Sequence, residues 1–371
     1  MLKTEKAALL AALNVVNDAV KAKNTIPILA DVLIEKDGAG ITLTGGNLSM
    51  EIRSHCAAEV DGDFPSFTCP AARLLAIVKA APDTRITIEV VEGGQQVQIR
   101  SGKSRLKLPA MKGPDYPKLD VGKVEHTASL NASSMQKAID GVAFAAETAA
   151  DRPYLCGVYL HADAKGMHLV ATNGRVLAKR TLPAIEFDQD VSTIPGIIVP
   201  NEAIGPITKI LGSGEDAEIQ ISKEKLVVAV GKVRMITKLI DGTFPDYVRI
   251  MPAKESITAG FSAQALASAV NRVIIATPDA GFGMSFDFTA DRLALAARDA
   301  KAGEGEDEIA VTSSGDLVTG FNGRFVDQAL SHLDGDDAEL KIGKDAAPAL
   351  LRRKGDEDNY IILMPTKVRA G

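Results

Sequence analysis

The sequence predicts an α+β protein built from three tandem copies of one module. One apolar helical spacing occurs three times, a strand that runs directly into a helix occurs three times, and the first two copies end in an aromatic residue followed by proline. We place the boundaries near residues 125 and 254, which gives modules of 1–125, 126–254 and 255–371. Three unrelated α+β stretches are the alternative, but the repeated order of these features makes chance the weaker explanation.

The first helix of each module is predicted from apolar residues that recur with steps of four, three and four. This spacing places one apolar stripe along a helix, as is typical of a helix that packs on a sheet. The three matching sets are Leu9, Leu13, Val16 and Val20; Met135, Ile139, Val142 and Ala146; and Leu266, Val270, Val273 and Thr277.

The second helix of each module is predicted to follow a short apolar strand. The three segments are FTCPAARLLAIVKAA from residue 67, IIVPNEAIGPITKIL from residue 197 and VTGFNGRFVDQALSHL from residue 318. Pro70 and Pro200 stand where a missing backbone N–H costs little, and Asn322 offers a capping side chain at the matching place.

The rest of each module has the alternating pattern of antiparallel strands. Apolar residues alternate at 86–90 and 97–99 around the Gly93-Gly94 turn, and again at 219–221 and 226–228. The first two modules close with Tyr116-Pro117 and Phe244-Pro245, in linkers that carry glycine and proline.

Composition limits the possible class of protein. The chain has 371 residues, of which 46% are hydrophobic and 24% charged, as in ordinary globular proteins. No apolar run approaches the roughly 20 residues that cross a bilayer, and the charged N-terminus lacks the apolar segment of a signal peptide. Three cysteines without a C-x-x-C pair argue against a disulfide framework, so we expect a cytoplasmic protein without membrane contact.

Charge is shared unevenly among the modules. The first has 16 basic and 15 acidic residues, the second 14 of each, and the third 12 basic and 19 acidic, giving net charges of +1, 0 and −7. An acidic last module and a mildly basic first module favour head-to-tail association of two chains. The alternative is that the acidic charge only keeps the third module soluble.

No motif indicates catalysis, a metal or a cofactor, so we expect none of these. The usual phosphate loops, zinc motifs and nucleophile elbows are absent from the sequence. His161 and His168 flank a predicted turn at Lys165-Gly166, and we expect two surface histidines rather than metal ligands. Cys156 is expected to be a buried thiol rather than a nucleophile.

Basic residues recur on matching elements of the modules. Lys21 and Lys23 end the first predicted helix, Arg73 lies on the second, and Arg152 with Tyr154 follows the third. Because these elements repeat, the residues could face one common surface that binds nucleic acid. Ordinary helix surfaces carry lysines as well, so the pattern does not decide between a surface that binds nucleic acid and an ordinary solvated one.

Five stretches spread over the whole chain match one known family. They are NTIPILADVLIE at 24–35, SGKSRLKLP at 101–109, DRPYLCGV at 151–158 with VATNGRVLA at 170–178, TKLIDGTFPDYVRIMP at 237–252, and NYIILMP at 359–365. The chain thereby resembles the DNA polymerase III beta subunit, the bacterial replicative sliding clamp. The resemblance implies a non-enzymatic protein of three similar domains, two chains of which close head to tail into a ring of six domains around duplex DNA. The implied partners are a clamp loader, and polymerases and repair proteins that carry short clamp-binding motifs.

The resemblance also implies three sets of site residues. Duplex DNA would be met without sequence preference by Lys23, Arg73, Arg152 and Tyr154. The ring interface would use Lys103, Arg105, Leu106 and Leu108 of one chain with Ile274, Ile275, Glu304 and Glu306 of the other. A cleft between domains two and three would take a peptide with a Gln followed by apolar and aromatic residues, and its wall maps onto Leu155, Thr172, Gly174, Val176, Leu177, Pro245, Arg249, Ile250, Ile362, Met364 and Pro365. For Leu177 and Ile362 a simple core role is an equal alternative.

The chain departs from the family pattern at several positions. Asn173-Gly174-Arg175-Val176 stands where relatives usually have Asp-Gly-His-Arg, and Asn201-Glu202 replaces a basic pair. Pro206 falls inside a predicted helix, where it removes one backbone bond. The chain ends in Met364-Pro365-Thr366-Lys367-Val368 and three further residues, rather than in Met-Pro-Met-Arg-Leu. These changes predict an altered partner preference rather than a different fold.

Two other classes of function stay open from the sequence. One is a cytoplasmic α+β enzyme with an unrecognised active site at a domain interface, which would need titratable residues converging in one cleft. The other is a monomeric binding scaffold without a DNA role. A clamp must dimerise, so the native mass in solution separates these classes.

Overall fold

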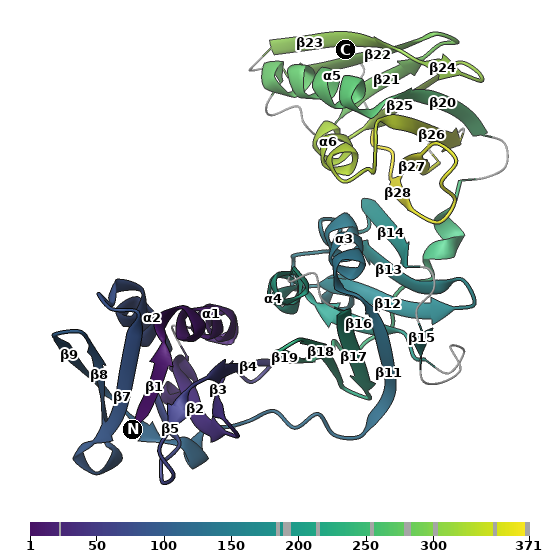
Figure 1. The fold of residues 1–371 in the computed structure, drawn as a ribbon. Helices are drawn as coiled ribbons and strands as arrows, with labels where there is room; N and C mark the ends of the chain where they lie inside the picture. Colours follow the sequence, from purple (N-terminus) through teal and green to yellow (C-terminus); the bar gives the residue numbers. More distant parts are fainter. Residues whose placement is uncertain are drawn as a thin grey trace. The chain divides into compact units, whose positions relative to one another are not determined.

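The computed structural model describes residues 1–21, 24–182, 186–187, 194–212, 216–252, 256–277, 283–299, 303–343 and 347–367. Strands and helices follow one order three times along the chain (Figure 1), which confirms the predicted three-module α+β architecture. By internal contacts the chain divides into two compact units, one made of Met1–Gln136, Ile185–Thr193 and Glu202–Leu239, the other of Lys137–Ala184, Ile194–Asn201 and Ile240–Gly371.

The first repeat carries two helices and ten strands among its described residues. In chain order its elements are β1 (Leu2–Glu5), α1 (Lys6–Val16), η1 (Asn17–Ala19), η2 (Pro27–Ala30), β2 (Asp31–Asp37), β3 (Gly40–Gly46), β4 (Met50–Ala57), β5 (Glu59–Val60), β6 (Phe67–Pro70), α2 (Ala71–Ala80), β7 (Arg85–Val91), η3 (Glu92–Gly94), β8 (Gln96–Ser101), β9 (Ser104–Pro109), β10 (Met111–Lys112) and η4 (Gly113–Asp115). The predicted alternation holds, because Ile86, Ile88, Val97 and Ile99 are all buried.

The second and third repeats follow the same order. The second contains β11 (Val124–Asn131), α3 (Ala132–Ala143), η5 (Pro153–Leu155), β12 (Gly157–Asp163), β13 (Gly166–Thr172), β14 (Val176–Leu182), β15 (Glu186–Phe187), β16 (Ile197–Pro200), α4 (Asn201–Leu211), β17 (Asp216–Ser222), β18 (Lys225–Val230), β19 (Val233–Lys238) and η7 (Tyr247–Ile250). The third contains β20 (Ser256–Ser262), α5 (Ala263–Ala276), β21 (Met284–Phe288), β22 (Arg292–Asp299), β23 (Gly303–Ala310), β24 (Thr312–Ser313), β25 (Leu317–Phe321), α6 (Gly323–Ser331), β26 (Asp337–Gly343), β27 (Ala349–Arg353) and β28 (Tyr360–Leu363).

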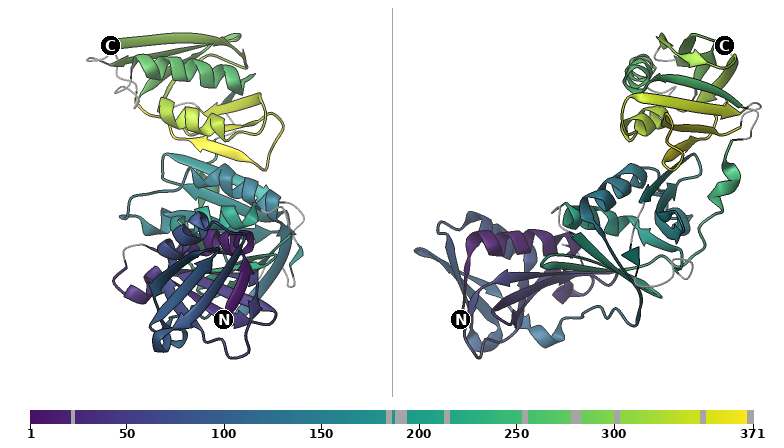
Figure 2. Two further views of the ribbon diagram at one scale, coloured as in Figure 1. Left: turned by 60° about the vertical axis from the view of Figure 1, so that its left-hand side comes forward. Right: turned by 45° about the vertical axis from the view of Figure 1, so that its right-hand side comes forward.

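The predicted helices form, but each first helix is shorter than its apolar stripe. Val20, Ala146 and Thr277, the last member of each stripe, lie just beyond α1, α3 and α5. Thr277 shows the reason: its hydroxyl donates to the Val273 carbonyl at 2.7 Å, so the side chain closes the helix instead of extending it. In the first and third repeats the two helices lie side by side (Figure 2).

The strand-to-helix joints are also confirmed. β6 runs into α2, β16 into α4 and β25 into α6. Asn322 caps α6, since its Oδ1 accepts the backbone N–H of Arg324 at 3.0 Å. Pro206 lies inside α4 without ending it, because the helix continues to Leu211.

Four antiparallel sheets contain the described strands, and two of them join neighbouring repeats. Their strand orders are β5-β1-β7-β8-β9, β10-β6-β2-β3-β4-β19-β18-β17-β11-β15, β16-β12-β13-β14-β28-β27-β26-β20-β24 and β23-β22-β21-β25. The first joint is the pairing of β19 with β4, and the second is the pairing of β28 with β14. The counterparts of these strands at the two ends of the repeat array are β9 and β23, and both are sheet edges.

The two joints are built alike down to single hydrogen bonds. In the turns before β4 and β14, Asn47 and Asn173 each accept two backbone N–H groups, two and three residues later, at 2.8 and 3.0 Å and at 2.9 and 2.9 Å. The carbonyl two residues after each asparagine then accepts the backbone N–H of Lys238 at 2.8 Å in the first joint and of Met364 at 2.9 Å in the second. The repetition seen in the sequence therefore extends to the geometry of the joints.

The aromatic residues before the linkers pack back onto their own repeats. Tyr116 packs with Leu29, a residue of the 3-10 turn η2. Phe244 lies in a cluster with Leu155 of the matching turn η5, and its ring stacks on Tyr159 with centroids 4.7 Å apart. Each aromatic-proline pair thus fixes the point where the chain leaves the repeat.

The expectation of two surface histidines is wrong. His161 and His168 are cross-strand partners on β12 and β13, with ring centroids 4.8 Å apart. His168 is 2% exposed, and its Nδ1 and Nε2 lie 3.0 Å from Thr181 Oγ1 and 2.8 Å from Asp163 Oδ1. The sequence pattern missed this because β13 lies between two other strands, inside the nine-stranded sheet.

The described residues contain neither a membrane-spanning helix nor a metal-binding cluster. No described helix is long and apolar enough to cross a membrane. No group of three or more His, Cys, Asp or Glu side chains within the same residues could hold a metal ion.

Replacing Gly45 by alanine should destabilise the first unit. A Cβ at this position of β3 would lie 2.3 Å from the carbonyl oxygen of Val16, which is backbone and cannot move aside. We expect Gly45→Ala to lower the free energy of unfolding by roughly 2 kcal/mol. Chemical denaturation measures this change. Gly62→Ala is the matched control, because nothing lies within 4 Å of its Cβ position; equal stability of both variants would contradict the close helix-sheet contact.

Candidate functional site

The predicted cleft residues gather around one hydrophobic cluster in the second unit. Leu155, Leu177 and Ile362 belong to this cluster and are 4%, 2% and 0% exposed. Leu177 and Ile362 are also direct partners across the β14–β28 joint. The core role that the sequence left open therefore applies to both, and they can form the floor of a site but not an open wall.

Other predicted cleft residues form an exposed rim above this floor. Pro245 and Arg249 are exposed, Met364 is 37% exposed, and Ile250 is half-buried where it packs on the cluster. A flexible methionine with an arginine beside an apolar floor can accommodate apolar side chains and a polar backbone.

The turn between β13 and β14 forms a rigid part of the same region. The Thr172 hydroxyl donates to the Val176 carbonyl at 2.8 Å and accepts the Gly174 N–H at 3.0 Å. Gly174 has φ +81°, which favours glycine, and the atom closest to its missing Cβ is Arg152 Nη1 at 3.1 Å. Thr172 and Val176 are buried, so they shape the turn while Gly174 is exposed.

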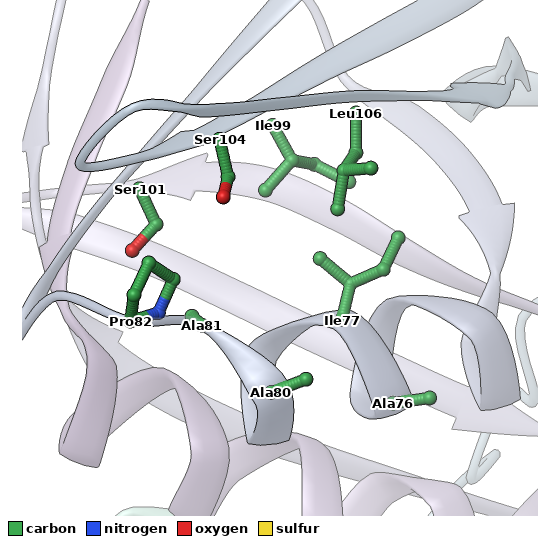
Figure 3. Close-up of a pocket in the computed structure, with 9 residues that line it drawn as sticks. All are labelled: Ala76, Ile77, Ala80, Ala81, Pro82, Ile99, Ser101, Ser104 and Leu106. Atoms are coloured by element: carbon green, nitrogen blue, oxygen red, sulfur yellow. The ribbon is translucent and has the colours of Figure 1, made fainter.

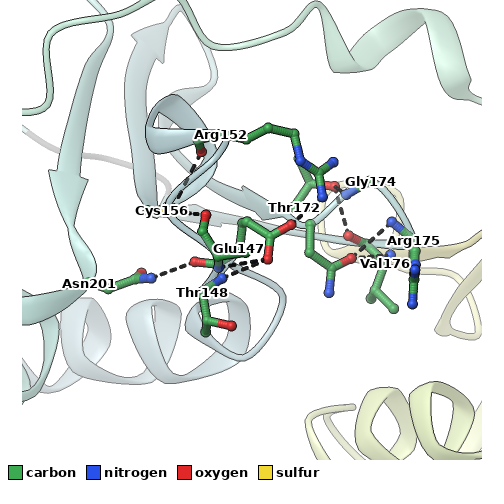
Figure 4. A network of polar contacts seen from close by, with 11 residues as sticks. Glu147, Thr148, Arg152, Cys156, Thr172, Gly174, Arg175, Val176 and Asn201 are labelled. Atoms are coloured by element: carbon green, nitrogen blue, oxygen red, sulfur yellow. Dashed lines mark hydrogen bonds and ion pairs between the residues drawn. The ribbon is translucent and has the colours of Figure 1, made fainter.

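Glu147 organises the polar contacts beside this turn (Figure 4). Its carboxylate accepts the N–H groups of Thr148 at 2.8 Å and Ala149 at 3.1 Å and forms an ion pair with Arg152. Its backbone carbonyl accepts the side-chain N–H of Asn201 at 2.7 Å. The two backbone N–H groups, with smaller effects from nearby arginines, lower the pKa of Glu147, so it is a carboxylate at neutral pH.

The residues predicted to meet DNA have different environments. Lys23 lies outside the described residues. Arg73 is exposed on α2. Arg152 is held by Glu147, with 40% of its side chain still accessible, and Tyr154 packs against the cleft cluster instead of standing free. Of the set, Arg73 is the described residue whose side chain is most available to solvent.

Glu202, which replaces a basic residue of the family pattern, forms one of two ion pairs that link α4 to residues 18–21 in the first unit. Its carboxylate lies 2.9 Å from Lys21 Nζ, and Lys209 Nζ lies 2.6 Å from Asp18. Lys21 is therefore partly neutralised where the sequence suggested a free cation. Exposed pairs of this kind add little stability.

The predicted interface strand β9 has two different faces. Leu106 is 45% exposed and lines a cavity of about 270 Å³ between α2 and strands β8 and β9. Figure 3 shows Ile77 of α2 pointing toward Leu106 and Ile99 across this cavity. Lys103 and Arg105 are exposed and do not line the cavity, whereas Leu108 is buried.

The second predicted interface set lies on α5 and β23. Ile275 is 79% exposed, while Ile274 packs near Gly323 at the start of α6. On β23, Glu304 and Glu306 are exposed on the face that points away from α5. The opposite face carries glycines that lie against α5, together with Asp307, whose Oδ2 lies 2.5 Å from Arg272 Nε.

Sequence reasoning missed several residues of these regions. Tyr159, Tyr247, Phe244 and Tyr360 all contribute to the cleft cluster, and the cavity beside β9 depends on small residues such as Ala76 of α2. The aromatic-proline pair pointed to Phe244. Nothing in the periodicity of α2 indicated the cavity, because it forms between a helix and a hairpin that are separate in the sequence.

Comparisons with known proteins agree with this organisation. Family models of the DNA polymerase III beta subunit match the chain three times, with the N-terminal domain at residues 1–120, the central domain at 129–246 and the C-terminal domain at 248–367. The beta sliding clamp of Caulobacter vibrioides is 30% identical over 99% of this chain and 100% of its own length. That of Escherichia coli is 25% identical over 98% of this chain and 99% of its own length.

Solved structures give the same result. A crystal structure of the Caulobacter crescentus beta sliding clamp has a TM-score of 0.93 at 30% identity and covers 99% of this chain and 98% of that one. A sliding clamp from Bartonella birtlesii, a DNA polymerase III subunit beta, has a TM-score of 0.92 at 30% identity, with 99% of both chains covered. Full-length agreement of sequence, domain order and structure has one explanation: the chain belongs to the DNA polymerase III beta subunit family, the beta sliding clamps.

Proposed function

We propose that this sliding clamp works as a head-to-tail homodimer, a ring of six domains that encircles duplex DNA and tethers polymerases and other partners. The observation that carries the proposal is the pair of open sheet edges, β9 and β23. Family membership disfavours the alternative of an enzyme with an active site at a domain interface.

The repeat pattern supports pairing of β9 with β23 of a second chain. Within the chain, β19 pairs with β4 and β28 pairs with β14, so the third strand after the second helix of one repeat meets the third strand after the first helix of the repeat before it. β9 and β23 hold these two positions at the ends of the array, and each pairs on one side only in the described sheets. Unpaired edges are surfaces ready for strand addition, and a second chain would satisfy both.

Charge on the two edges is complementary. Arg105 and Lys107 share the face of β9 that points away from the cavity, and Lys103 lies in the turn just before this strand; Glu304 and Glu306 share the face of β23 that points away from α5. If the helix-facing sides of the two strands align in the dimer, the acidic row meets the basic row. Such pairs at an interface rim favour the correct orientation more than they add affinity.

The apolar side of the same interface is also complementary in shape. The cavity beside β9 is open and lined by Leu106, Ile77 and Ile99, and Ile275 projects from α5 with 79% of its surface exposed. An exposed isoleucine beside an acidic edge, and an apolar cavity beside a basic edge, fit as the centre of one interface.

Ile275→Lys should convert the dimer to monomer. Placing a charge in a desolvated pocket costs about 2 kcal/mol or more, which weakens the dimer roughly thirtyfold or more. Analytical ultracentrifugation across a concentration series measures the change. Val318→Lys is the matched control, because Val318 is 64% exposed on β25, the other edge of the same sheet. An unchanged mass for Ile275→Lys, or equal loss with Val318→Lys, would remove Ile275 from the interface.

The proposed contact with DNA is weak and topological. Arg73 supplies an exposed cation, Arg152 a partly neutralised one, and Lys23 and Tyr154 complete the proposed set. A chain with net charge −6 has no bulk attraction for phosphate, so retention by encirclement explains how such a protein stays on DNA and still slides.

Loaded protein should stay on circular DNA and leave linear DNA. After loading on a nicked circle, cutting the circle with a restriction enzyme should release most of the protein, because the open ends remove the topological barrier. Gel filtration of the loaded complex before and after cutting shows this release. Arg73→Ala should weaken DNA binding equally for all sequences. It should also reduce the slope of log affinity against log salt concentration by about one, as expected for the loss of one phosphate contact. Equal retention on both DNA forms would contradict encirclement.

A peptide cleft in the second unit is proposed as the tether for partners. The solved Caulobacter crescentus structure has polyethylene glycol bound to a putative beta-motif tethering region, and the Bartonella birtlesii structure is bound to griselimycin. In this chain the buried floor and exposed rim fit a peptide with apolar anchors. The replaced residues Arg175, Val176 and Thr366 favour an altered motif preference.

Met364→Ala should weaken peptide binding without unfolding the protein. Met364 is 37% exposed at the rim, so its loss removes contact with the peptide but little core packing. We expect roughly 1 kcal/mol, or about fivefold lower affinity, for a fluorescent peptide with a Gln followed by apolar and aromatic residues. Fluorescence anisotropy measures it. Met111→Ala is the matched control at 39% exposure on β10, and an equal effect of both changes would speak against the cleft. Leu177→Ala is a poorer test, since Leu177 is core.

The remaining assignments extend from family membership. We propose domains of 1–125, 126–254 and 255–371, a clamp loader that opens the ring, polymerases and repair proteins as motif-bearing partners, no enzymatic activity of its own, and a cytoplasmic location where bacterial DNA is replicated. The three family-model matches and the names of the full-length relatives support these assignments.

A further inference from the structure

A hydrogen bond ties one wall of the proposed cleft to the sheet. Tyr247 begins the turn η7, which also carries Arg249 and Ile250. The Tyr247 ring packs against the cleft cluster, and its hydroxyl lies 2.8 Å from Nε2 of His161 on β12. At the other side of this turn, Asp246 accepts the Val248 N–H at 3.3 Å. The His161 bond is thus a directional side-chain contact that ties the turn to a strand, in addition to this packing.

The first repeat makes a corresponding contact with different chemistry. Glu35 is the fifth residue of β2, as His161 is the fifth residue of β12, and both strands follow a proline-led 3-10 turn. Lys118, two residues beyond Tyr116, places its Nζ 2.6 Å from Glu35 Oε2. The same strand position therefore contacts the segment that leaves the repeat in both cases. The contact is a repeated feature of the module.

From this repeated geometry we infer that His161 is a positioning residue for partner binding: through Tyr247 it holds the turn 247–250 against the cleft floor. The inference rests on the proposed peptide cleft and adds to it a residue that lies outside the cleft wall. His161 need not touch the peptide. Its effect is to keep Arg249 and Ile250 preorganised at the rim, so that a peptide does not have to order the turn on binding.

The surroundings of His161 keep it in the form that this role needs. Burial, and then the neighbouring His168, lower the pKa of His161 to about 4; Asp163 opposes this effect, and Lys179 adds a smaller lowering. A neutral imidazole in its Nδ1–H tautomer accepts the Tyr247 O–H at Nε2, and in its Nε2–H tautomer it donates to the Tyr247 oxygen, so either tautomer keeps the bond. Burial raises the pKa of Tyr247 well above its ordinary value, so the hydroxyl keeps its proton.

His168, the cross-strand partner of His161, is itself held by neighbouring side chains. The His168 ring lies against His161, and its Nδ1 lies 3.0 Å from Thr181 Oγ1. The Thr181 hydroxyl also contacts Lys179 Nζ at 2.8 Å and the Asp358 carbonyl at 3.1 Å. The His161 ring is supported on this side by His168 and on another by the tilted Tyr159 ring, with centroids 5.1 Å apart, so it has little freedom and its bond to Tyr247 is directional.

Peptide affinity in a double-mutant cycle tests the inference. With the fluorescent peptide described for Met364, we expect Tyr247→Phe and His161→Ala each to lower affinity roughly three- to tenfold, chiefly through faster dissociation. The double variant should be no weaker than the worse single variant, because both changes remove one bond. His161→Gln should restore affinity to within about twofold, since its side-chain oxygen can accept from Tyr247.

The first repeat supplies the matched control. Glu35→Ala and Lys118→Met remove the corresponding contact far along the chain from the cleft and should leave peptide affinity unchanged. Tyr247→Phe deletes one oxygen atom, and thermal unfolding of each variant shows whether the fold is kept. Wild-type binding with unaffected Tyr247→Phe and His161→Ala variants would overturn the role of His161 alone. A wild-type chain that binds no peptide would overturn the proposed cleft and this inference together.

Discussion

Backbone pairing between neighbouring repeats is the constraint on which the rest of the molecule depends. In each repeat the third strand after the second helix has N–H and C=O groups that need partners, and β19 and β28 find them on β4 and β14. The continuous sheets that result bury the apolar faces of two repeats at once. Because the array has ends, the same rule leaves one side of β9 and one side of β23 unpaired in the described sheets, and the proposed dimer would satisfy both.

The proposed binding site depends on the same constraint. Leu177 and Ile362 are partners across the second joint and also part of the buried cluster under the proposed cleft, so joining the repeats creates the apolar base on which a peptide would rest. The first joint has the same backbone but a different floor: Glu51, at the position of Leu177, is 1% exposed and accepts from Arg53 Nε at 2.6 Å and from the Leu119 N–H at 2.8 Å. Identical hydrogen-bonded frames thus carry different chemistry, because side chains vary where the backbone cannot.

Much of the fold was predictable from the sequence because local patterns encode it. The helical stripes, the strand-to-helix joints and the Asn322 cap depend on neighbouring residues and appear as expected. The exposed rim residues Met364 and Arg249 and the projecting Ile275 were named from family motifs, and the structure places them at the surface. The helix ends were less predictable, since Thr277 closes α5 through its hydroxyl instead of continuing the stripe.

By itself the sequence determined the three-fold repeat, the order of elements, the uneven charge of the modules and the family, since all of these are written in local spacing and composition. Only the tertiary structure decided which side chains are floor and which are rim, because burial of Leu177 depends on a strand nearly two hundred residues away. It also decided the environment of the histidines. The sequence shows only two polar residues beside a turn. In the structure β13 lies between two strands, so His168 is buried, and His161 contacts Tyr247. Contacts between distant segments set the environment of a side chain, and no local pattern records them.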